Sequence, residues 1–153
     1  MTPQPSRQRS LELERARVAW QCIQEVVEEN KKLEDKDRYW GEYRSLAMSA
    51  PADVQANGLG QTAAFWRAKG YERDKDSKEP KPKSNSAHAK LLQHLARWLS
   101  EESVRILPKG KDLVAWISTE AQPEAYRRAT AEAIAFLIWL RRFAEAELAK
   151  EEE

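Results

Sequence analysis

The sequence predicts an all-α fold, a single-domain bundle of about six helices with a long, largely buried C-terminal helix. Helix-favouring residues (Ala, Leu, Glu, Lys and Arg) dominate the composition, and the chain has only five glycines. No segment of useful length alternates apolar with polar residues, as a half-buried strand would. A chain of 153 residues is long enough for one hydrophobic core and too short for two, so residues 1–153 are expected to form one domain.

The first predicted helix runs from about Ser10, its N-cap, to about Asp35. Residues 1–9 before it are expected to be disordered. Apolar side chains recur along this helix at spacings of three and four, which predicts one buried face. That face comprises Leu13, Ala16, Trp20, Ile23 and Val27.

A second helix is predicted from about Arg38 to Ser49. It ends before Pro51, because a proline disfavours the helical conformation of the residue that precedes it. Pro51 then begins a third helix, which reaches Lys69.

Two glycines, Gly58 and Gly60, fall inside this third predicted helix. Each costs about 1 kcal/mol there relative to alanine, so the pair requires a reason. Either another helix packs closely against the glycines, or a further backbone, of protein or nucleic acid, approaches them.

The same glycines, with Ala63, fit the dinucleotide-binding pattern G-x-G-x-x-A. That pattern requires a buried strand leading into the first glycine. The preceding segment, "SAPADVQA", has one β-branched residue, a proline and no apolar run, and therefore does not predict a strand. We expect no cofactor.

Residues 71–86 combine mixed charge with prolines and almost no apolar side chains, which predicts a mobile charged linker. A fourth helix begins near Ser86 and ends near Ser100. Its broad apolar stripe consists of His88, Leu91, Leu92, Leu95, Trp98 and Leu99.

A short helix is predicted at about Lys111 to Thr119, and a long one from Pro123 to about Lys150. Residues 133–140 of the long helix are apolar all round, so other helices are expected to cover it. A frayed tail, residues 150–153, follows.

No catalytic or metal-binding constellation is evident. His88 and His94 are six residues apart, a spacing that does not place them on one helical face as metal ligands. We expect His88 to be partly buried and His94 to lie on the surface. Cys22 is the only cysteine, which excludes an internal disulfide and fits a reducing cytoplasm. No apolar run is long enough to span a membrane, so the protein is expected to be soluble. Because no catalytic constellation is evident, it is also expected not to be an enzyme.

The net charge is only +1, so affinity for a polyanion would have to come from local patches. Arg127 and Arg128 are followed fourteen residues later by Arg141 and Arg142, on the same side of the last helix. These arginines form either a basic strip or ordinary ion pairs with Glu124, Glu132 and Glu145.

Three stretches carry a family resemblance: "YRSLAMSAPADVQANGLGQTAAFWRAK", "LLQHLARWLS" and "YRRATAEAIAFLIWLRRFAEAEL". With them the chain resembles the small α-helical subunit of the Cmr complex, the type III-B CRISPR RNA-guided effector. Where family members often have a lysine, this chain has Arg141, which keeps the charge.

The resemblance implies a non-catalytic subunit in antiviral defence that stacks in several copies beside other Cmr subunits, the crRNA and the target RNA. The residues expected to contact RNA are Arg44, Arg67, Lys69, Arg127, Arg141 and Arg142. The residues expected at subunit contacts or close approaches are Asn57, Gly58, Gly60 and Trp66. The alternative is a helical protein–protein adaptor that does not contact nucleic acid.

Overall fold

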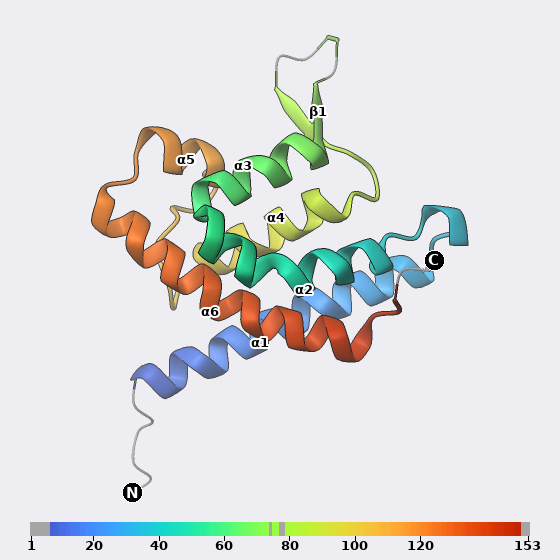
Figure 1. Cartoon of the computed structure of the whole chain (residues 1–153), viewed down its shortest axis with the longest axis horizontal. Coiled ribbons are helices and arrows are strands. Elements are labelled where there is room, and N and C mark those ends of the chain that lie inside the picture. Colours follow the sequence, from blue (N-terminus) through green and yellow to red (C-terminus); the bar gives the residue numbers. More distant parts are fainter. Residues whose placement is uncertain (1–6, 74, 77–78, 151–153) are drawn as a thin grey trace, which may run out of the picture.

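Helices form nearly all of the regular structure in the computed structural model, which describes residues 7–73, 75–76 and 79–150 (Figure 1). The predicted all-α class and the long C-terminal helix are therefore confirmed. The helices are α1 (Arg7–Lys31), α2 (Trp40–Asn57), α3 (Leu59–Gly70), α4 (Ala87–Leu99), α5 (Leu113–Thr119) and α6 (Pro123–Glu147). A 3-10 turn, η1 (Asp35–Asp37), and two short strands, β1 (Tyr71–Arg73) and β2 (Pro80–Pro82), complete the elements.

Helix α4 lies between two groups of helices. It contacts α3 on one side, and α1, α2 and α6 on the other. Its Leu91, Leu95 and Trp98 are fully buried, and the Trp98 ring stacks on Phe136 of α6 with centroids 5.5 Å apart. Helix α4 thus buries its apolar stripe against both groups of helices.

The C-terminal helix α6 buries one stripe of side chains against α1 and α2. That stripe consists of Ala129, Ala133, Phe136, Leu137, Leu140 and Ala144. Ile138, within the run expected to be covered on all sides, is 52% exposed. The expectation of full coverage was wrong at this position, because the helices that contact α6 leave Ile138 in solvent.

Helix α1 begins at Arg7 rather than Ser10, so residues 7–9 are helical, while residues 1–6 lie outside the described residues. Its buried face is also rotated from the prediction: Leu13 is 59% exposed and Trp20 42% exposed. The residues that face the core are Val18, Ala19, Cys22, Ile23 and Val26. Figure 1 shows the N-terminal turns of α1 extending past the other helices.

The second and third helices meet at Gly58 and not at Pro51. Pro51 is buried inside α2, where burial of the helix outweighs the missing backbone donor. Gly58 has a φ of 87°, a conformation that favours glycine, and its N–H donates to the Val54 carbonyl at 2.8 Å. Because a helix and not a strand leads into Gly58, the dinucleotide-binding geometry is absent here.

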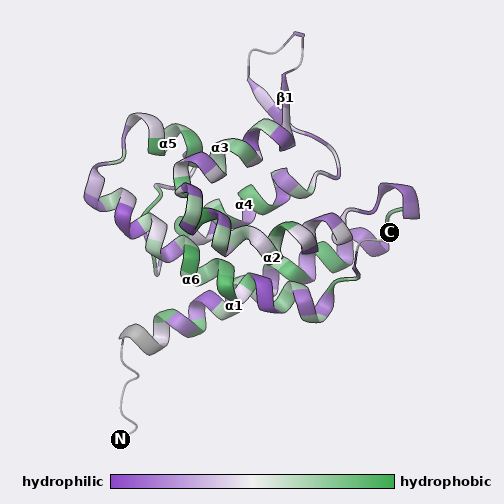
Figure 2. Cartoon of the chain, in the orientation of Figure 1, coloured by the Kyte–Doolittle hydropathy of each residue, from purple (hydrophilic) through white to green (hydrophobic). Residues whose placement is uncertain are grey.

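Residues 71–86 contain a small antiparallel hairpin, although the sequence predicted no folded structure for them. Tyr71 pairs with Pro82, and the Lys83 N–H donates to the Gly70 carbonyl at 2.8 Å. The ladder is made by backbone groups, so it needs little apolar surface, and Figure 2 shows mostly hydrophilic residues along it. Residues 74 and 77–78 of this segment, and 151–153 of the expected frayed tail, lie outside the described residues.

Candidate nucleic-acid interface

The outward face of α6 carries two pairs of arginines. Arg127, Arg128, Arg141 and Arg142 are all exposed. Fourteen residues at 1.5 Å per residue separate the pairs by about 21 Å along the helix. Among the residues that the structure describes, none of the four guanidinium groups has an ion-pair partner. These arginines therefore present uncompensated positive charge to solvent.

The carboxylate of Glu132, which lies four residues after Arg128 on α6, is engaged elsewhere. Arg15 of α1 binds it through two contacts, Nε to Oε1 at 2.6 Å and Nη2 to Oε2 at 2.9 Å. Glu124 and Glu145 are exposed and form no ion pair within the described part of the chain. The alternative in which the α6 arginines form local surface ion pairs is thus not the arrangement adopted.

Aromatic side chains brace α6 beside Arg141 and Arg142. The half-buried Phe143 ring meets Trp20 of α1 edge-on, with centroids 5.3 Å apart. The Trp139 ring of α6 also contacts Phe143, with centroids 5.7 Å apart. Such contacts between rings fix the position of α6 against α1 and hence the position of the arginine pair.

Arg67 and Lys69 of α3 point to different partners. The Arg67 guanidinium forms an ion pair with Asp112 and lies over the Tyr71 ring, 5.2 Å from its centroid. Lys69 is exposed, and its ammonium lies 5.8 Å from the centroid of Phe65. The charge of Arg67 is therefore partly compensated by Asp112, whereas no carboxylate among the described residues pairs with Lys69.

The residues expected at subunit contacts or close approaches lie partly in the core and partly at the surface. Trp66, expected at a subunit contact, is instead a core side chain, 2% exposed. The Gly60 N–H donates to the Tyr126 hydroxyl at 3.0 Å, and a Cβ on Gly58 or Gly60 would lie 3.4 Å from that oxygen. The positive φ accounts for Gly58, whereas a Cβ on Gly60 would make ordinary van der Waals contacts with side chains of the same chain. Asn57 is exposed at the end of α2.

Arg44, also expected to contact RNA, is only partly accessible. Its side chain is half-buried on α2, and its Nε is buried without a hydrogen-bond partner in the described residues. Its guanidinium is therefore less accessible to a phosphate than those of the exposed arginines on α6.

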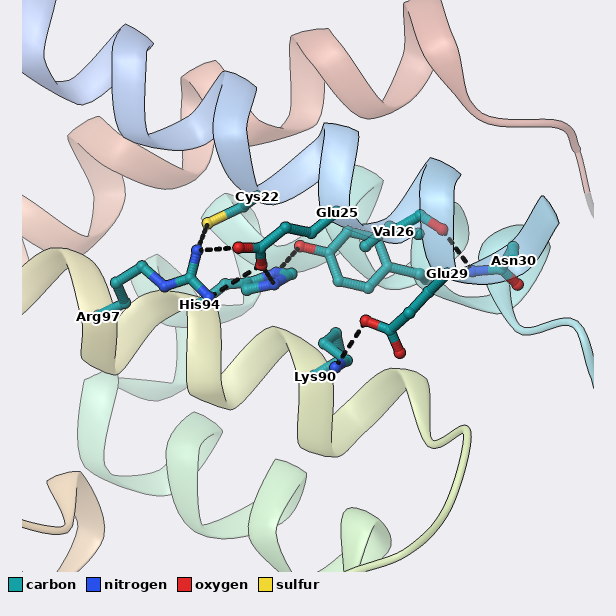
Figure 3. Close-up of polar contacts among 9 residues, drawn as sticks. Cys22, Glu25, Val26, Glu29, Asn30, Lys90, His94 and Arg97 are labelled. Carbon is teal, nitrogen blue, oxygen red and sulfur yellow. Dashed lines mark hydrogen bonds and ion pairs between the residues drawn. The ribbon is translucent and has the colours of Figure 1, made fainter. Parts of the chain in front are cut away.

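A polar cluster around the buried His94 joins α1, α2 and α4 (Figure 3). His94, expected on the surface, is fully buried, and its Nδ1 lies 2.6 Å from the Tyr43 hydroxyl. Its Nε2 faces Glu25 at 3.6 Å, and both Glu25 oxygens accept from Arg97, at 3.0 and 2.8 Å. His94 lies three residues after Leu91 and four before Trp98, so its spacing places it on the apolar face of α4, a local signal that the sequence-based expectation missed.

The protonation states in this cluster follow from burial and charge. Burial lowers the pKa of His94, which keeps the ring neutral. The His94 ring, together with Arg97, lowers the pKa of Glu25 to about 2. Burial raises the pKa of Cys22 to about 12, so its thiol stays protonated and unreactive as a nucleophile. The cluster therefore serves to hold three helices together.

His88 is half-buried, as expected. Its ring meets Phe65 edge-on at 6.1 Å, and its Nδ1 lies 3.4 Å from a Glu42 oxygen. Within the described ranges, no three His, Cys, Asp or Glu side chains are grouped so that they could hold a metal ion. None of the described helices combines the length and apolar character needed to cross a membrane.

Comparison with known proteins identifies similar sequences along nearly the whole chain. The model of the family "CRISPR-associated protein (Cas_Cmr5)" matches residues 11–147. The CRISPR system Cmr subunit Cmr5 of Thermus thermophilus is 32% identical over 132 residues, which cover 86% of this chain and 94% of that protein.

Proposed function

The chain belongs to the Cas_Cmr5 family and is a small subunit of a Cmr complex, and on this premise we propose that it is a non-catalytic subunit that contacts the backbone of target RNA. In this proposal it stacks in several copies beside other Cmr subunits, along the duplex of crRNA and target. It acts in the cytoplasm, in antiviral defence.

The observation that carries the proposal is the set of exposed arginines on α6 that have no ion-pair partner within the described residues. Guanidinium groups bind phosphate oxygens through two parallel hydrogen bonds. Contacts of this kind position a protein on nucleic acid without reading its sequence. A subunit serving many different targets requires this property.

A single copy offers few such contacts, so its own affinity for RNA is low. Several copies in a row would present the same contacts repeatedly along one strand. Binding then strengthens through effective concentration, with no new contact inside a subunit.

One observation favours the adaptor alternative. Ile138 is 52% exposed and lies between the two arginine pairs of α6. An apolar side chain at the centre of this face suits contact with another protein. A protein–protein adaptor would use Ile138, and its arginines would meet carboxylates of the partner rather than phosphates.

The test is to purify an assembly that contains this chain and to ask whether nuclease-protected RNA co-purifies with it. Cross-linking then shows whether that RNA contacts this chain. Cross-links from RNA to residues of α6 are the expected result. An assembly in which RNA is protected but cross-links only to other subunits would support the adaptor.

A further inference from the structure

An open groove lies along the junction of α2 and α3, on a surface that the arginines of α6 do not occupy. Its volume is about 470 Å³, within the roughly 300–1,000 Å³ of sites that bind small molecules. It is called the Phe65 groove below. Its lining residues are Asp53, Asn57, Gln61, Thr62, Phe65 and Trp66.

Phe65 provides an apolar ring in a polar setting. It is 54% exposed, whereas its neighbour Trp66 is 2% exposed. Packing does not require an aromatic ring here, because half of its surface faces solvent. An exposed ring beside polar groups suits a planar aromatic ligand that stacks on it.

The polar groups of the groove match the edge of a nucleobase. Asn57 and Gln61 are exposed, and each amide both donates and accepts hydrogen bonds, as base edges do. Asp53 Oδ2 accepts from the Ser49 hydroxyl at 3.0 Å, and its Oδ1 makes no hydrogen bond to the described residues. A carboxylate repels phosphate but accepts from the amino groups of bases. The groove therefore favours a base over a phosphate.

Positive charge lies at the end of the groove where Phe65 stands. The ammonium of Lys69 is 5.8 Å from the Phe65 centroid, and the His88 ring lies edge-on to Phe65. Burial lowers the pKa of His88; the Glu42 carboxylate opposes this shift, and Lys69 and Lys83 add to it. A phosphate attached to a base in the groove would meet this charge.

We propose that the Phe65 groove binds one unpaired nucleobase of single-stranded RNA. The base stacks on Phe65, Asn57 and Gln61 hydrogen-bond its edge, and Lys69 contacts the neighbouring phosphate. The choice of RNA as the ligand rests on the proposed function. The site itself is separate from the arginines of α6. The junction that forms it packs on Tyr126, the residue before Arg127.

The experiment is an NMR titration of the full chain at low salt with two short oligomers of equal charge. One is single-stranded RNA, and the other is the same ribose-phosphate chain without bases. The side-chain amide signals of Asn57 and Gln61 and the indole signal of Trp66 should shift with the RNA and not with the abasic oligomer. Equal shifts with both oligomers, or no shift with either, would overturn the proposal.

Variants at Phe65 sharpen the test. Phe65→Ala should reduce affinity for the RNA at least about fivefold and leave the affinity for the abasic oligomer unchanged. Phe65→Trp should retain RNA affinity, because a ring is still present. The control Leu13→Ala removes another exposed apolar side chain, 59% exposed, and should change neither affinity.

Failure of this site is distinguishable from failure of the proposed function. If Phe65→Ala leaves RNA affinity unchanged while loss of Arg141 and Arg142 weakens it, only the groove proposal is wrong. If Phe65→Ala instead blocks incorporation into the assembly without changing RNA affinity, the groove holds a side chain of another subunit, and the proposal is again wrong. If RNA touches this chain neither alone nor in the assembly, the proposed function fails as well.

Discussion

Arg15 and Glu132 form an ion pair with two hydrogen bonds, at 2.6 and 2.9 Å, that ties α1 to α6. Both side chains are largely buried, 17% and 15% exposed. The pair holds the helix that presents the arginines, and it also occupies the carboxylate that Arg128 would otherwise contact.

The first prediction concerns this pair. In a double-mutant cycle of Arg15→Ala and Glu132→Ala, the coupling energy should be about 1 to 3 kcal/mol, because a paired, largely buried charge is costly to leave alone. Urea denaturation of the four proteins measures it. A coupling energy near zero would show that the contact does not stabilise the packing of α1 on α6.

The second prediction concerns the crossing of α3 and α4. A Cβ on Gly70 would lie 2.4 Å from the backbone nitrogen of Ala89, so neither helix could stay in place. Gly70→Ala should therefore lower the free energy of unfolding by about 1 to 3 kcal/mol. Gly60→Ala is the control, since its Cβ would meet only side-chain atoms at 3.4 Å and should cost less. Equal stability of the Gly70 variant and the natural chain would contradict the close crossing.

The third prediction is a loss of stability in acid. The folded-state pKa of His94 lies below its unfolded value, so the unfolded chain binds the proton first as pH falls. The stability is complete above pH 6.5 and declines below it. Glu25, with a pKa of about 2 against 4.5, adds a further decline below pH 4.5. Because this carboxylate is 48% exposed, its share is on the order of 1 kcal/mol.

Chemical denaturation between pH 8 and pH 4 tests this dependence. His94→Asn removes the titrating ring, and an Asn oxygen can still accept from Tyr43. Its stability should therefore change less than that of the natural chain between pH 7 and pH 5. If both proteins lose stability equally over that interval, His94 is not the group responsible.

Helices with a strong local pattern were predicted well. The stripe of Leu91, Leu95 and Trp98 is buried as predicted, and α4 begins at Ala87, where the Ser86 hydroxyl accepts from the Ala89 N–H at 3.1 Å. Such features depend on residues within a few positions of one another. The sequence therefore determines them without reference to the rest of the fold.

Features that depend on distant residues were not predicted. Arg67 has no acidic neighbour in its own helix, yet it pairs with Asp112, 45 residues away. Tyr43 and Glu25, the polar partners of His94, lie on other helices. Pro51 continues a helix because the surrounding core buries it. In each case tertiary packing overrode the local preference.

The fourth prediction concerns the isolated chain. It should bind single-stranded RNA weakly and with little preference for sequence, because its basic groups form small patches on a chain of net charge +1. Titrations of RNAs of different sequence at two salt concentrations measure this. Tight or salt-insensitive binding by the isolated chain would contradict a mechanism based on repeated weak contacts.

The fifth prediction concerns Arg141 and Arg142 in the assembled complex. Replacing both with alanine should leave the helical content unchanged, since neither has an ion-pair partner among the described residues. Replacing both arginines with glutamate should impair RNA binding more than replacing both with alanine, because a carboxylate repels phosphate. The control replaces Lys36 and Lys109, neither of which belongs to α6 and each of which has a side chain 77% exposed, by alanine.

The most direct measurement is the salt dependence of target-RNA binding by the assembly that carries the Arg141→Ala, Arg142→Ala chain. Affinity should fall equally for all target sequences, and the slope of its logarithm against that of the salt concentration should flatten by about one unit per lost phosphate contact. The lysine control should keep the slope of the natural assembly. A folded, fully assembled variant with an unchanged salt slope would show that this face of α6 does not contact the RNA backbone.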